Sequence, residues 1–401
     1  MSHDVNNDEK LNISGNNRGR KKKKSLPFGC SSRVAVCLVF CIICSAVVLV
    51  VACWDSFSPK GISSWFSAAG TSEEDFPVDI EGTNILDNNI GYVNGSLVYV
   101  SDTSVVSLMN NGEQKFVEQH NFLNPAIKTH GFKSIAYNVG GNNYRIISEN
   151  EEVYEGTQGS AITDCDISPT GFYGVLSDQA GYLSVFFVYN PQNEVIFSYS
   201  FNDYYAVSVA MNESGTMAAI GAVNTDNGEM VSKVYILDFT KTEPINVLTY
   251  NDRIVYGIEP VTDKSFAVVT DSSLSVVSTD KLVENVYSFE QKTLTSYDVS
   301  YDNSIAVSLS RSDDKRDCCI VYMDVEGNEL NTISTNLKIT SLSICDDRIA
   351  CLADSQLVVY NGYGDEFGTW EVGSDARCAI LSQTKTAYIL GVSEIRRYSL
   401  K

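Results

Sequence analysis

The stretch Ala161-Ile-Thr-Asp-Cys-Asp-Ile-Ser-Pro-Thr-Gly-Phe-Tyr-Gly-Val-Leu176 predicts two short β-strands joined by a tight turn. The flanking residues are mostly apolar, aromatic or β-branched, as is typical of strands. Between them, Asp166-Ile-Ser-Pro-Thr-Gly171 has the Asp, Ser, Pro and Gly residues that favour a turn. Residues 182–189 and 195–199 follow as a third and a fourth strand. This part of the chain therefore predicts a four-stranded unit.

The unit recurs along the chain. Second strands are expected to begin at Leu97, Phe132, Phe172, Met217, Ser265, Ser304, Arg348 and Thr386, at intervals of 35 to 48 residues. First strands are expected at 90–93, 161–167, 206–210, 254–258, 294–299, 339–344 and 376–381. Such spacing is typical of the blades of a β-propeller. The second strands are apolar on both faces, which fits strands packed between neighbouring blades.

The number of blades is predicted to be eight, with seven as the alternative, because the second unit, residues 126–157, has the least regular pattern. The last unit ends after three strands. The stretch Phe76-Pro-Val-Asp-Ile80 is placed to supply its fourth strand and so to close the ring between the two ends of the domain. Closure of this kind leaves only short, protected edges.

A membrane anchor is predicted ahead of the propeller. Residues Val34 to Cys53 contain no charge and no proline, and a run of Arg and Lys at 18–24 precedes them. Twenty residues in a helix span about 30 Å, and flanking positive charges favour the cytoplasmic side. We therefore expect a disordered cytoplasmic tail (1–32), a transmembrane helix (33–54), a spacer (55–75) and an extracytoplasmic propeller (76–401), with the N-terminus in the cytoplasm.

The anchor also permits a second interpretation. Val50-Val51-Ala52-Cys53 approximates a lipobox, so that cleavage before Cys53 and lipidation of its thiol would give a lipoprotein. The apolar stretch is longer than the usual ~7–15 residues of a signal-peptide core, which favours the uncleaved anchor. Both interpretations leave the propeller outside the membrane.

The charge and the cysteines narrow the range of functions that the sequence permits. From Asp55 onward the chain has 47 acidic against 21 basic residues, which argues against nucleic-acid binding. The six cysteines of the propeller have no disulfide or CxxC spacing, so we expect buried thiols. Only His120 and His130 lie in the propeller, so no zinc site is expected.

The Asp166–Gly171 turn resembles the aspartate-serine-proline-x-glycine turn of WD-repeat-like and quinoprotein-like propellers. More broadly, the order of basic tail, Val- and Cys-rich anchor, spacer and acidic propeller resembles a family of single-span, membrane-anchored quinoprotein-like propellers from Firmicutes, chiefly clostridia. The resemblance implies a Gram-positive envelope location. It implies no activity, cofactor or catalytic residue.

Signatures of propeller enzymes are missing from the sequence. There are no repeated tryptophan motifs for pyrroloquinoline quinone, no sialidase boxes and no Gly-x-Ser-x-Gly elbow, so no cofactor and no catalytic residue is predicted. Three carboxylate pairs, 164 with 166, 313 with 314 and 346 with 347, are expected at strand ends and turns, where Asp caps backbone N–H groups. Asn224-Thr-Asp-Asn-Gly228 is interpreted as a long hairpin turn and not as a calcium loop.

Four tyrosines near expected loop edges, Tyr204, Tyr205, Tyr360 and Tyr363, are the candidate partner contacts, because tyrosine offers a large contact area with a polar tip. Packing between blades is the alternative role for them. The first functional hypothesis is a non-enzymatic module that binds a protein or an envelope polymer through loops on one face. The alternatives are an enzyme that processes an envelope glycan or peptide in the propeller channel, and a eukaryotic endoplasmic-reticulum propeller glycosylated at Asn94 and Asn212.

Overall fold

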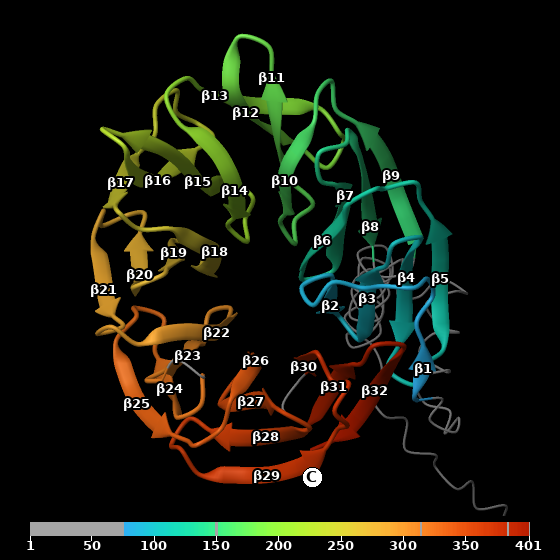
Figure 1. Ribbon diagram of the computed structural model, residues 1–401. Coiled ribbons are helices and arrows are strands. Elements are labelled where there is room, and N and C mark those ends of the chain that lie inside the picture. The colour runs from blue at the N-terminus through green and yellow to red at the C-terminus, as the bar shows by residue number, and fades with distance from the viewer. Residues whose placement is uncertain (1–75, 149–150, 313–314, 383–384, 401) are drawn as a thin grey trace, which may run out of the picture. The chain divides into compact units, whose positions relative to one another are not determined.

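The computed structural model describes residues 76–148, 151–312, 315–382 and 385–400. The predicted tail, membrane helix and spacer (1–75) lie outside these residues. The regular elements that it describes are β-strands, and none of the described residues form a helix long and apolar enough to cross a membrane. The strands form eight four-stranded antiparallel sheets arranged around a common centre, so the predicted eight-bladed propeller is confirmed (Figure 1).

The blades are numbered from the N-terminus. Blades 1 to 4 consist of β2 (Ile90–Val93), β3 (Ser96–Val100), β4 (Ser104–Met109), β5 (Gln114–Gln119); β6 (Pro125–His130), β7 (Lys133–Asn138), β8 (Asn143–Ser148), β9 (Glu151–Thr157); β10 (Ile162–Ile167), β11 (Tyr173–Gln179), β12 (Tyr182–Tyr189), β13 (Val195–Phe201); and β14 (Tyr205–Met211), β15 (Met217–Asp226), β16 (Glu229–Asp238), β17 (Asn246–Asn251). Blades 5 to 8 consist of β18 (Val255–Thr262), β19 (Ser265–Thr270), β20 (Ser273–Ser278), β21 (Glu284–Ser288); β22 (Thr293–Ser300), β23 (Ser304–Ser310), β24 (Cys318–Met323), β25 (Glu329–Ser334); β26 (Ile339–Cys345), β27 (Arg348–Ala353), β28 (Gln356–Asn361), β29 (Glu366–Glu371); and β30 (Cys378–Ser382), β31 (Thr386–Leu390), β32 (Glu394–Ser399), β1 (Val78–Asp79).

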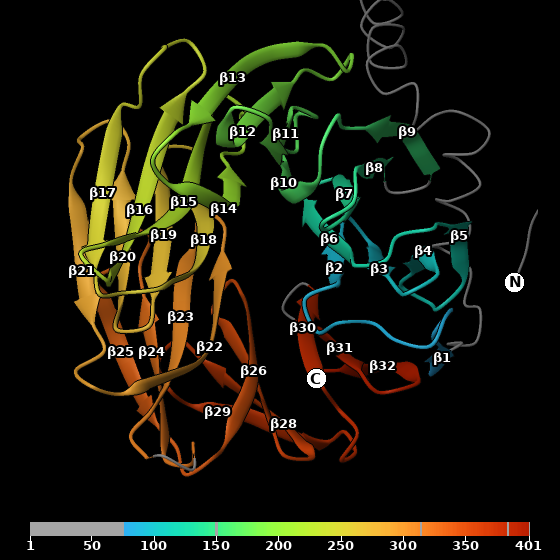
Figure 2. The same cartoon turned by 45° about the horizontal axis from the view of Figure 1, so that its top comes forward.

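Blade 8 is built from both ends of the domain. Its first three strands are the last three of the chain, and β1 pairs with β32 through Val78 opposite Ile395 and Asp79 opposite Glu394. Both views show β1 beside β32 (Figures 1 and 2). The predicted closure of the ring by residues 76–80 is therefore confirmed. Blade 2, whose sequence pattern is the least regular, is a complete four-stranded sheet.

The hydrophobic core lies between blades. Each of eight clusters of buried side chains joins one blade to the next, as where Leu176 and Phe186 of blade 3 meet Val209 and Met211 of blade 4. Second strands such as β19 and β23 are buried along their whole length because a neighbouring blade covers each face. The six described cysteines are free thiols, four of them buried and two partly buried.

The hairpin between β15 and β16 is tighter than the sequence suggested. Both strands continue to a two-residue turn, in which Asn227 and Gly228 have φ angles of 50° and 88°. These are the positive angles that a type I′ turn requires and that Asn and Gly tolerate. Asn224 to Asp226 are therefore strand residues, and the predicted long turn is replaced by a long hairpin with a short turn.

Candidate functional site

The first strand of every blade lies nearest the centre of the ring (Figure 1). One edge of such a strand pairs within its own blade, and the other edge faces the centre with unpaired backbone N–H groups, which must find acceptors. On β14, two of these groups are satisfied by blade 3. The N–H of Val209 donates to Asp164 Oδ2 at 2.8 Å, and the N–H of Met211 donates to Asp166 Oδ2 at 2.7 Å.

The same device joins blades 6 and 7. Ser296 Oγ accepts the N–H of Leu342 at 3.0 Å, and Asp298 Oδ2 accepts the N–H of Ile344 at 2.8 Å. The other oxygen of Asp298 accepts the N–H of Val299 at 3.0 Å, so one carboxylate caps two strands. Burial raises the pKa of Asp298 to about 6 although these hydrogen bonds favour its charged form.

Blades 7 and 8 use serine in place of aspartate. Ser341 and Ser343 of β26 accept the N–H groups of Ala379 and Leu381 of β30 at 3.2 and 3.1 Å. In each pair of blades, residues two apart on one strand bond to residues two apart on the next. Neighbouring first strands therefore run in the same direction. The carboxylates of Asp164, Asp166 and Asp298 have a structural task as connectors between blades.

Asp164 and Asp166 were expected at a strand end and a turn, where they would cap backbone N–H groups. Both lie within β10 and are buried, but their carboxylates do cap N–H groups, those of Val209 and Met211 in the next blade. Asp346 and Asp347 do occupy the turn between β26 and β27. The pair at 313 and 314 lies outside the described residues.

Lys128 and Tyr137 both bond to the buried carboxylate of Asp164. Lys128 Nζ of β6 donates to Asp164 Oδ2 at 2.8 Å and to the carbonyl oxygen of Val209 at 2.6 Å. The hydroxyl of Tyr137 donates to Asp164 Oδ1 at 2.5 Å. Burial by itself would lower the pKa of Lys128, but the carboxylates of Asp164 and Asp166 outweigh it and raise that pKa. Lys128 is thus held as a charged connector of blades 2, 3 and 4.

Glu259 of β18 differs from the other central carboxylates. It is partly exposed, and none of the described residues forms a hydrogen bond or ion pair with it. Burial raises the pKa of Glu259 to about 7, while Lys128 and His130 oppose the rise and Asp166 and Asp298 add to it. Among the described residues, Asp166 Oδ1 is also buried without a hydrogen-bond partner, 3.9 Å from His130 Nδ1. These two acids keep acceptor oxygens that the fold does not use.

A β-bulge recurs near the start of five first strands. Pairing to the second strand skips one residue in blades 3 to 7, and the bulged residues are Thr163, Val207, Tyr256, Thr295 and Thr340. A bulge turns a side chain away from the regular alternation of the strand. The hydroxyls of Thr295 and Thr340 donate to the carbonyl oxygens of Ser308 and Leu352 on the second strands, at 3.2 and 3.3 Å.

Blades 4 and 5 have no threonine for that bond and expose an apolar or aromatic side chain instead. Val207 is 41% exposed and Tyr256 is 58% exposed. Neither residue was singled out from the sequence. A signal for Tyr256 and Glu259 is present in the sequence. In Tyr256-Gly-Ile-Glu-Pro260, a glutamate and a proline interrupt the apolar pattern of an expected first strand.

Exposed apolar side chains occur on both faces of the propeller. We define the strand-start face as the end of the ring at which the first and third strands begin. Of the exposed large apolar residues that the structure describes, those on this face are Leu86, Leu123, Val139, Tyr182, Leu183, Tyr205, Val207, Met230, Ile254, Tyr256 and Val392. Those on the opposite face, where the second and fourth strands begin, are Phe132, Val195, Ile196, Val247, Leu282, Val283, Leu330, Tyr363 and Phe367. The two faces differ in where these residues stand: the ones on first strands, and so next to the ring centre, are Tyr205, Val207 and Tyr256, all on the strand-start face. Exposed apolar side chains gathered in one place are typical of a binding surface.

The four predicted tyrosines do not form one surface. Tyr204 and Tyr205 lie on the strand-start face, between β13 and β14, whereas Tyr360 and Tyr363 lie at the turn between β28 and β29, on the opposite face. Tyr204 is partly buried and packs under the ammonium group of Lys233, 4.2 Å from the ring centroid. Tyr205 is exposed and its hydroxyl donates to Asp178 at 2.6 Å. Tyr360 packs in the core between blades 6 and 7, and Tyr363 is 87% exposed.

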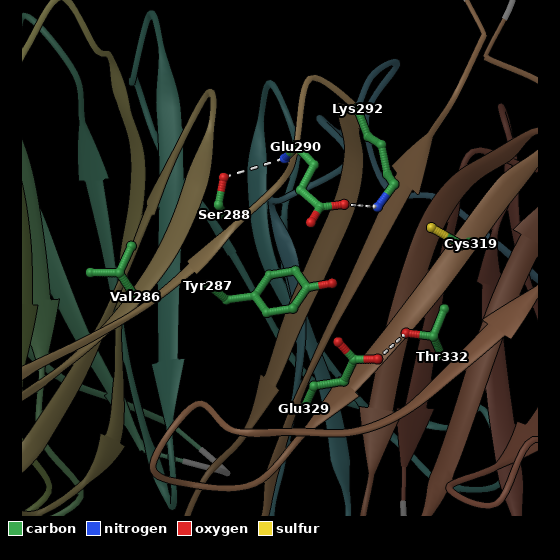
Figure 3. A pocket seen from close by; sticks show the side chains of 8 residues that line it. All are labelled: Val286, Tyr287, Ser288, Glu290, Lys292, Cys319, Glu329 and Thr332. Atoms are coloured by element: carbon green, nitrogen blue, oxygen red, sulfur yellow. Dashed lines mark hydrogen bonds and ion pairs between the residues drawn. The ribbon is translucent and has the colours of Figure 1, made fainter.

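A separate pocket lies at the outer side of blades 5 and 6, with a volume of about 450 Å³ (Figure 3). Its polar side chains are already paired with one another. Lys292 bonds to Glu290 at 3.4 Å, and the hydroxyl of Thr332 donates to Glu329 at 2.7 Å. The pocket therefore offers few free polar groups to a ligand, and we do not take it as the functional site.

No group of His, Cys, Asp and Glu within the described parts of the chain is arranged to hold a metal ion. His120 lies away from the ring centre, where its Nε2 bonds to the carbonyl oxygen of Ser101 at 3.1 Å and its Nδ1 accepts the N–H of Phe122 at 3.1 Å. The two histidines therefore occupy different surroundings.

Two solved structures share this architecture. BamB from Moraxella catarrhalis aligns with a TM-score of 0.51 and 12% sequence identity, over 80% of this chain and 99% of BamB. The C-terminal WD40 domain of Sif2 aligns with a TM-score of 0.57 and 12% identity, over 82% of this chain and 97% of that domain. At such low identity the likeness concerns the fold alone, and it confirms the predicted quinoprotein-like or WD-repeat-like propeller.

The sequence comparisons give the family. No curated protein matches the chain. Residues 78–397, which form nearly all of the propeller, match DUF5711, a family of unknown function. The protein belongs to the DUF5711 family.

Proposed function

We propose that this protein is a non-enzymatic binding module whose strand-start face engages a protein or an envelope polymer. The observation that carries the proposal is the exposure of apolar and aromatic side chains on first strands, next to the ring centre, which among the described residues occurs on that face alone. Val207 and Tyr256 stand at its middle, on first strands and therefore next to the ring centre. Loops and strand ends held on a rigid scaffold are where binding residues usually lie.

The alternative of an envelope glycan- or peptide-processing enzyme rests on Glu259, whose raised pKa would suit a general acid. Glycoside hydrolysis needs a second carboxylate on the other side of the scissile bond. The nearest candidates, Asp166 and Asp298, already accept backbone N–H groups of the next blade. This commitment favours binding over catalysis.

The proposed location is the outer side of a Gram-positive cell membrane, with residues 33–54 as a single transmembrane helix and the N-terminus in the cytoplasm. The charge pattern of residues 18–54 supports this orientation. Labelling of intact cells with a membrane-impermeant maleimide tests it. A Tyr363→Cys variant should gain label relative to the parent protein, and a Ser25→Cys variant should gain label only after the cells are opened. The reverse pattern would contradict the proposed orientation.

Binding through the strand-start face is tested by cross-linking of the full-length protein in its native membranes, followed by affinity purification and mass spectrometry. Two variants place a charge at an exposed tyrosine, Tyr256→Glu on the strand-start face and Tyr363→Glu on the opposite face. We expect a reproducible partner with the parent protein and with Tyr363→Glu, and loss of that partner with Tyr256→Glu. Loss with Tyr363→Glu alone would place binding on the other face.

A further inference from the structure

The centre of the ring carries an excess of negative charge. The groups that face Glu259 are Lys128 and His130 from β6, Asp166 from β10 and Asp298 from β22. Asp164 is neutralised by its ion pair with Lys128. The remaining acids, Asp166, Asp298 and Glu259, outnumber the one further basic group, His130. The net charge of this region therefore favours a positively charged ligand group.

Two acids in this region have carboxylate oxygens that accept no hydrogen bond from the described residues. Asp166 is 1% exposed, and its Oδ1 accepts no hydrogen bond from the described residues. Glu259 has no hydrogen-bond or salt-bridge partner there either. A buried acid without a partner reduces stability, so its presence in an otherwise well-paired ring centre points to use by a ligand.

Tyr256 lies on the same strand as Glu259, nearer to the strand-start face. On β18, Tyr256 precedes Glu259 by three residues, which corresponds to about 10 Å along a strand. An aromatic face attracts a cation, and the aliphatic stem of Lys or Arg packs along apolar surface while its charged end reaches a polar site. Tyr256 and Val207 suit the stem, and Glu259 with Asp166 suits the charged end.

We propose that the strand-start face binds a protein segment that inserts a lysine or arginine side chain beside Tyr256 to reach Glu259 at the centre of the ring, where the carboxylate of Asp166 adds negative charge. This inference rests on the binding function proposed above and names the chemistry of the partner. A metal ion is the less suitable occupant, because the described residues contain no set of ligands arranged for one. The raised pKa of Glu259 supports the inference, since a cation that paired with the carboxylate would bring that pKa back down.

The probe for this site is Nα-acetyl-arginine amide, with Nα-acetyl-citrulline amide as its neutral counterpart of nearly the same shape. Binding to the full-length protein in detergent is followed by ligand-observed NMR at pH 7.5. We expect the arginine probe to bind at least about tenfold more tightly than the citrulline probe, as a charge-assisted pair requires. Equal binding of the two probes would overturn the inference.

Variants locate the site. Glu259→Gln should weaken the arginine probe about tenfold, and Tyr256→Thr, which matches the residue type of Thr295 and Thr340, should weaken it about threefold. Tyr363→Ala is the control on the opposite face and should leave binding unchanged. Thermal unfolding confirms that each variant is folded. If Glu259→Gln binds the arginine probe as the parent does, the cation site is wrong.

The two proposals fail separately. A partner that is lost with Tyr256→Glu but retained with Glu259→Gln would leave the binding face in place and remove the basic side chain. Loss of the partner with both variants, together with the preference for arginine over citrulline, would support both.

Discussion

Blades 4 and 5 differ from blades 6 and 7 at equivalent positions of their first strands. In blades 6 and 7 the bulged residues are threonines whose hydroxyls bond to the second strand, and Asp298 caps two backbone N–H groups. In blades 4 and 5 the bulged residues are Val207 and Tyr256, and Glu259 has no partner. One side of the ring thus satisfies its own polar groups, while the other leaves apolar and acidic groups for a ligand.

The backbone shows the same contrast. Ala210 stands where Asp166 and Asp298 stand in their blades, two residues after Ser208 and one before Met211, and it has no acceptor to offer. On β18 the residue equivalent to Ala210 is Glu259, and the residue equivalent to Met211, whose N–H would face Ala210, is Pro260, which has no N–H to satisfy. A proline is tolerated at this free edge of a strand because no ladder bond is lost. Blades 4 and 5 are therefore joined by packing, without the side-chain caps found elsewhere.

The largest expected effect on stability is at blades 6 and 7, which we call the closed side of the ring. Asp298→Ala leaves the N–H groups of Val299 and Ile344 without their acceptor, and we expect the free energy of unfolding to fall by about 3 kcal/mol. Asp298→Asn keeps one acceptor oxygen and should lose less. Urea denaturation measures both. An Asp298→Ala protein as stable as its parent would show that the cap is dispensable.

At blades 4 and 5, which we call the open side, a substitution is expected to raise the stability. Glu259→Gln should raise the free energy of unfolding by about 2 kcal/mol at pH 8, because it removes a partly desolvated charge without a partner. The gain depends on pH. In the unfolded chain the carboxyl has its ordinary pKa, near 4.3, whereas in the folded protein burial raises the pKa of Glu259 to about 7.

Between these two values the folded protein binds more protons than the unfolded chain, so its stability falls as the pH rises from about 4 to about 7. The advantage of Glu259→Gln should therefore be greatest above pH 7 and absent at pH 4. Thermal unfolding of the two proteins across this range checks it. A constant difference at all pH values would mean that the charge of Glu259 is not its cause.

The interface between blades 4 and 5 gives a smaller effect. Pro260→Ala adds an N–H that no residue of β14 accepts and loosens the unfolded chain, so we expect a loss of about 1 kcal/mol. Ala210→Ser supplies a hydroxyl at the position from which the other blades cap this edge, and should recover part of the loss in the double variant. Strict additivity in a double-mutant cycle would argue that the two residues do not face each other.

The bulges give the smallest effect. Thr340→Val removes the bond from the threonine hydroxyl to the carbonyl oxygen of Leu352 and should cost at most about 1 kcal/mol. Tyr256→Thr, at the equivalent bulge, should leave the stability unchanged or slightly improved, since it replaces an exposed aromatic ring. Melting temperatures of the two variants test this opposition. Equal losses would show that Tyr256 supports the fold as Thr340 does.

The blades could be predicted from the sequence because their signal is local. Runs such as Ser265-Phe-Ala-Val-Val-Thr270 recur at a nearly constant interval and end in turn residues, and the first and last strands complete one another. The site could not be predicted because it depends on contacts between blades. Asp298 caps the N–H group of a residue about 45 positions away, so its role cannot be read from the local sequence. The bulges that expose Val207 and Tyr256 shift the strand register without a distinctive residue.

The tyrosines show the same limit. Tyr205 and Tyr363 look alike in the sequence, next to turn residues, yet the alternation of strand direction places them on opposite faces. The proposed binding face therefore includes Tyr205 and leaves out Tyr363.

The central claim is that the open side of the ring, at blades 4 and 5, is the binding side. The most direct measurement places a photo-cross-linking amino acid, in turn, at four of the five equivalent bulges, Val207, Tyr256, Thr295 and Thr340, in the full-length protein in its native membranes. We predict adducts to the same partner from positions 207 and 256 and little or none from positions 295 and 340. Adducts of equal yield from all four positions, or from 295 and 340 alone, would contradict the account.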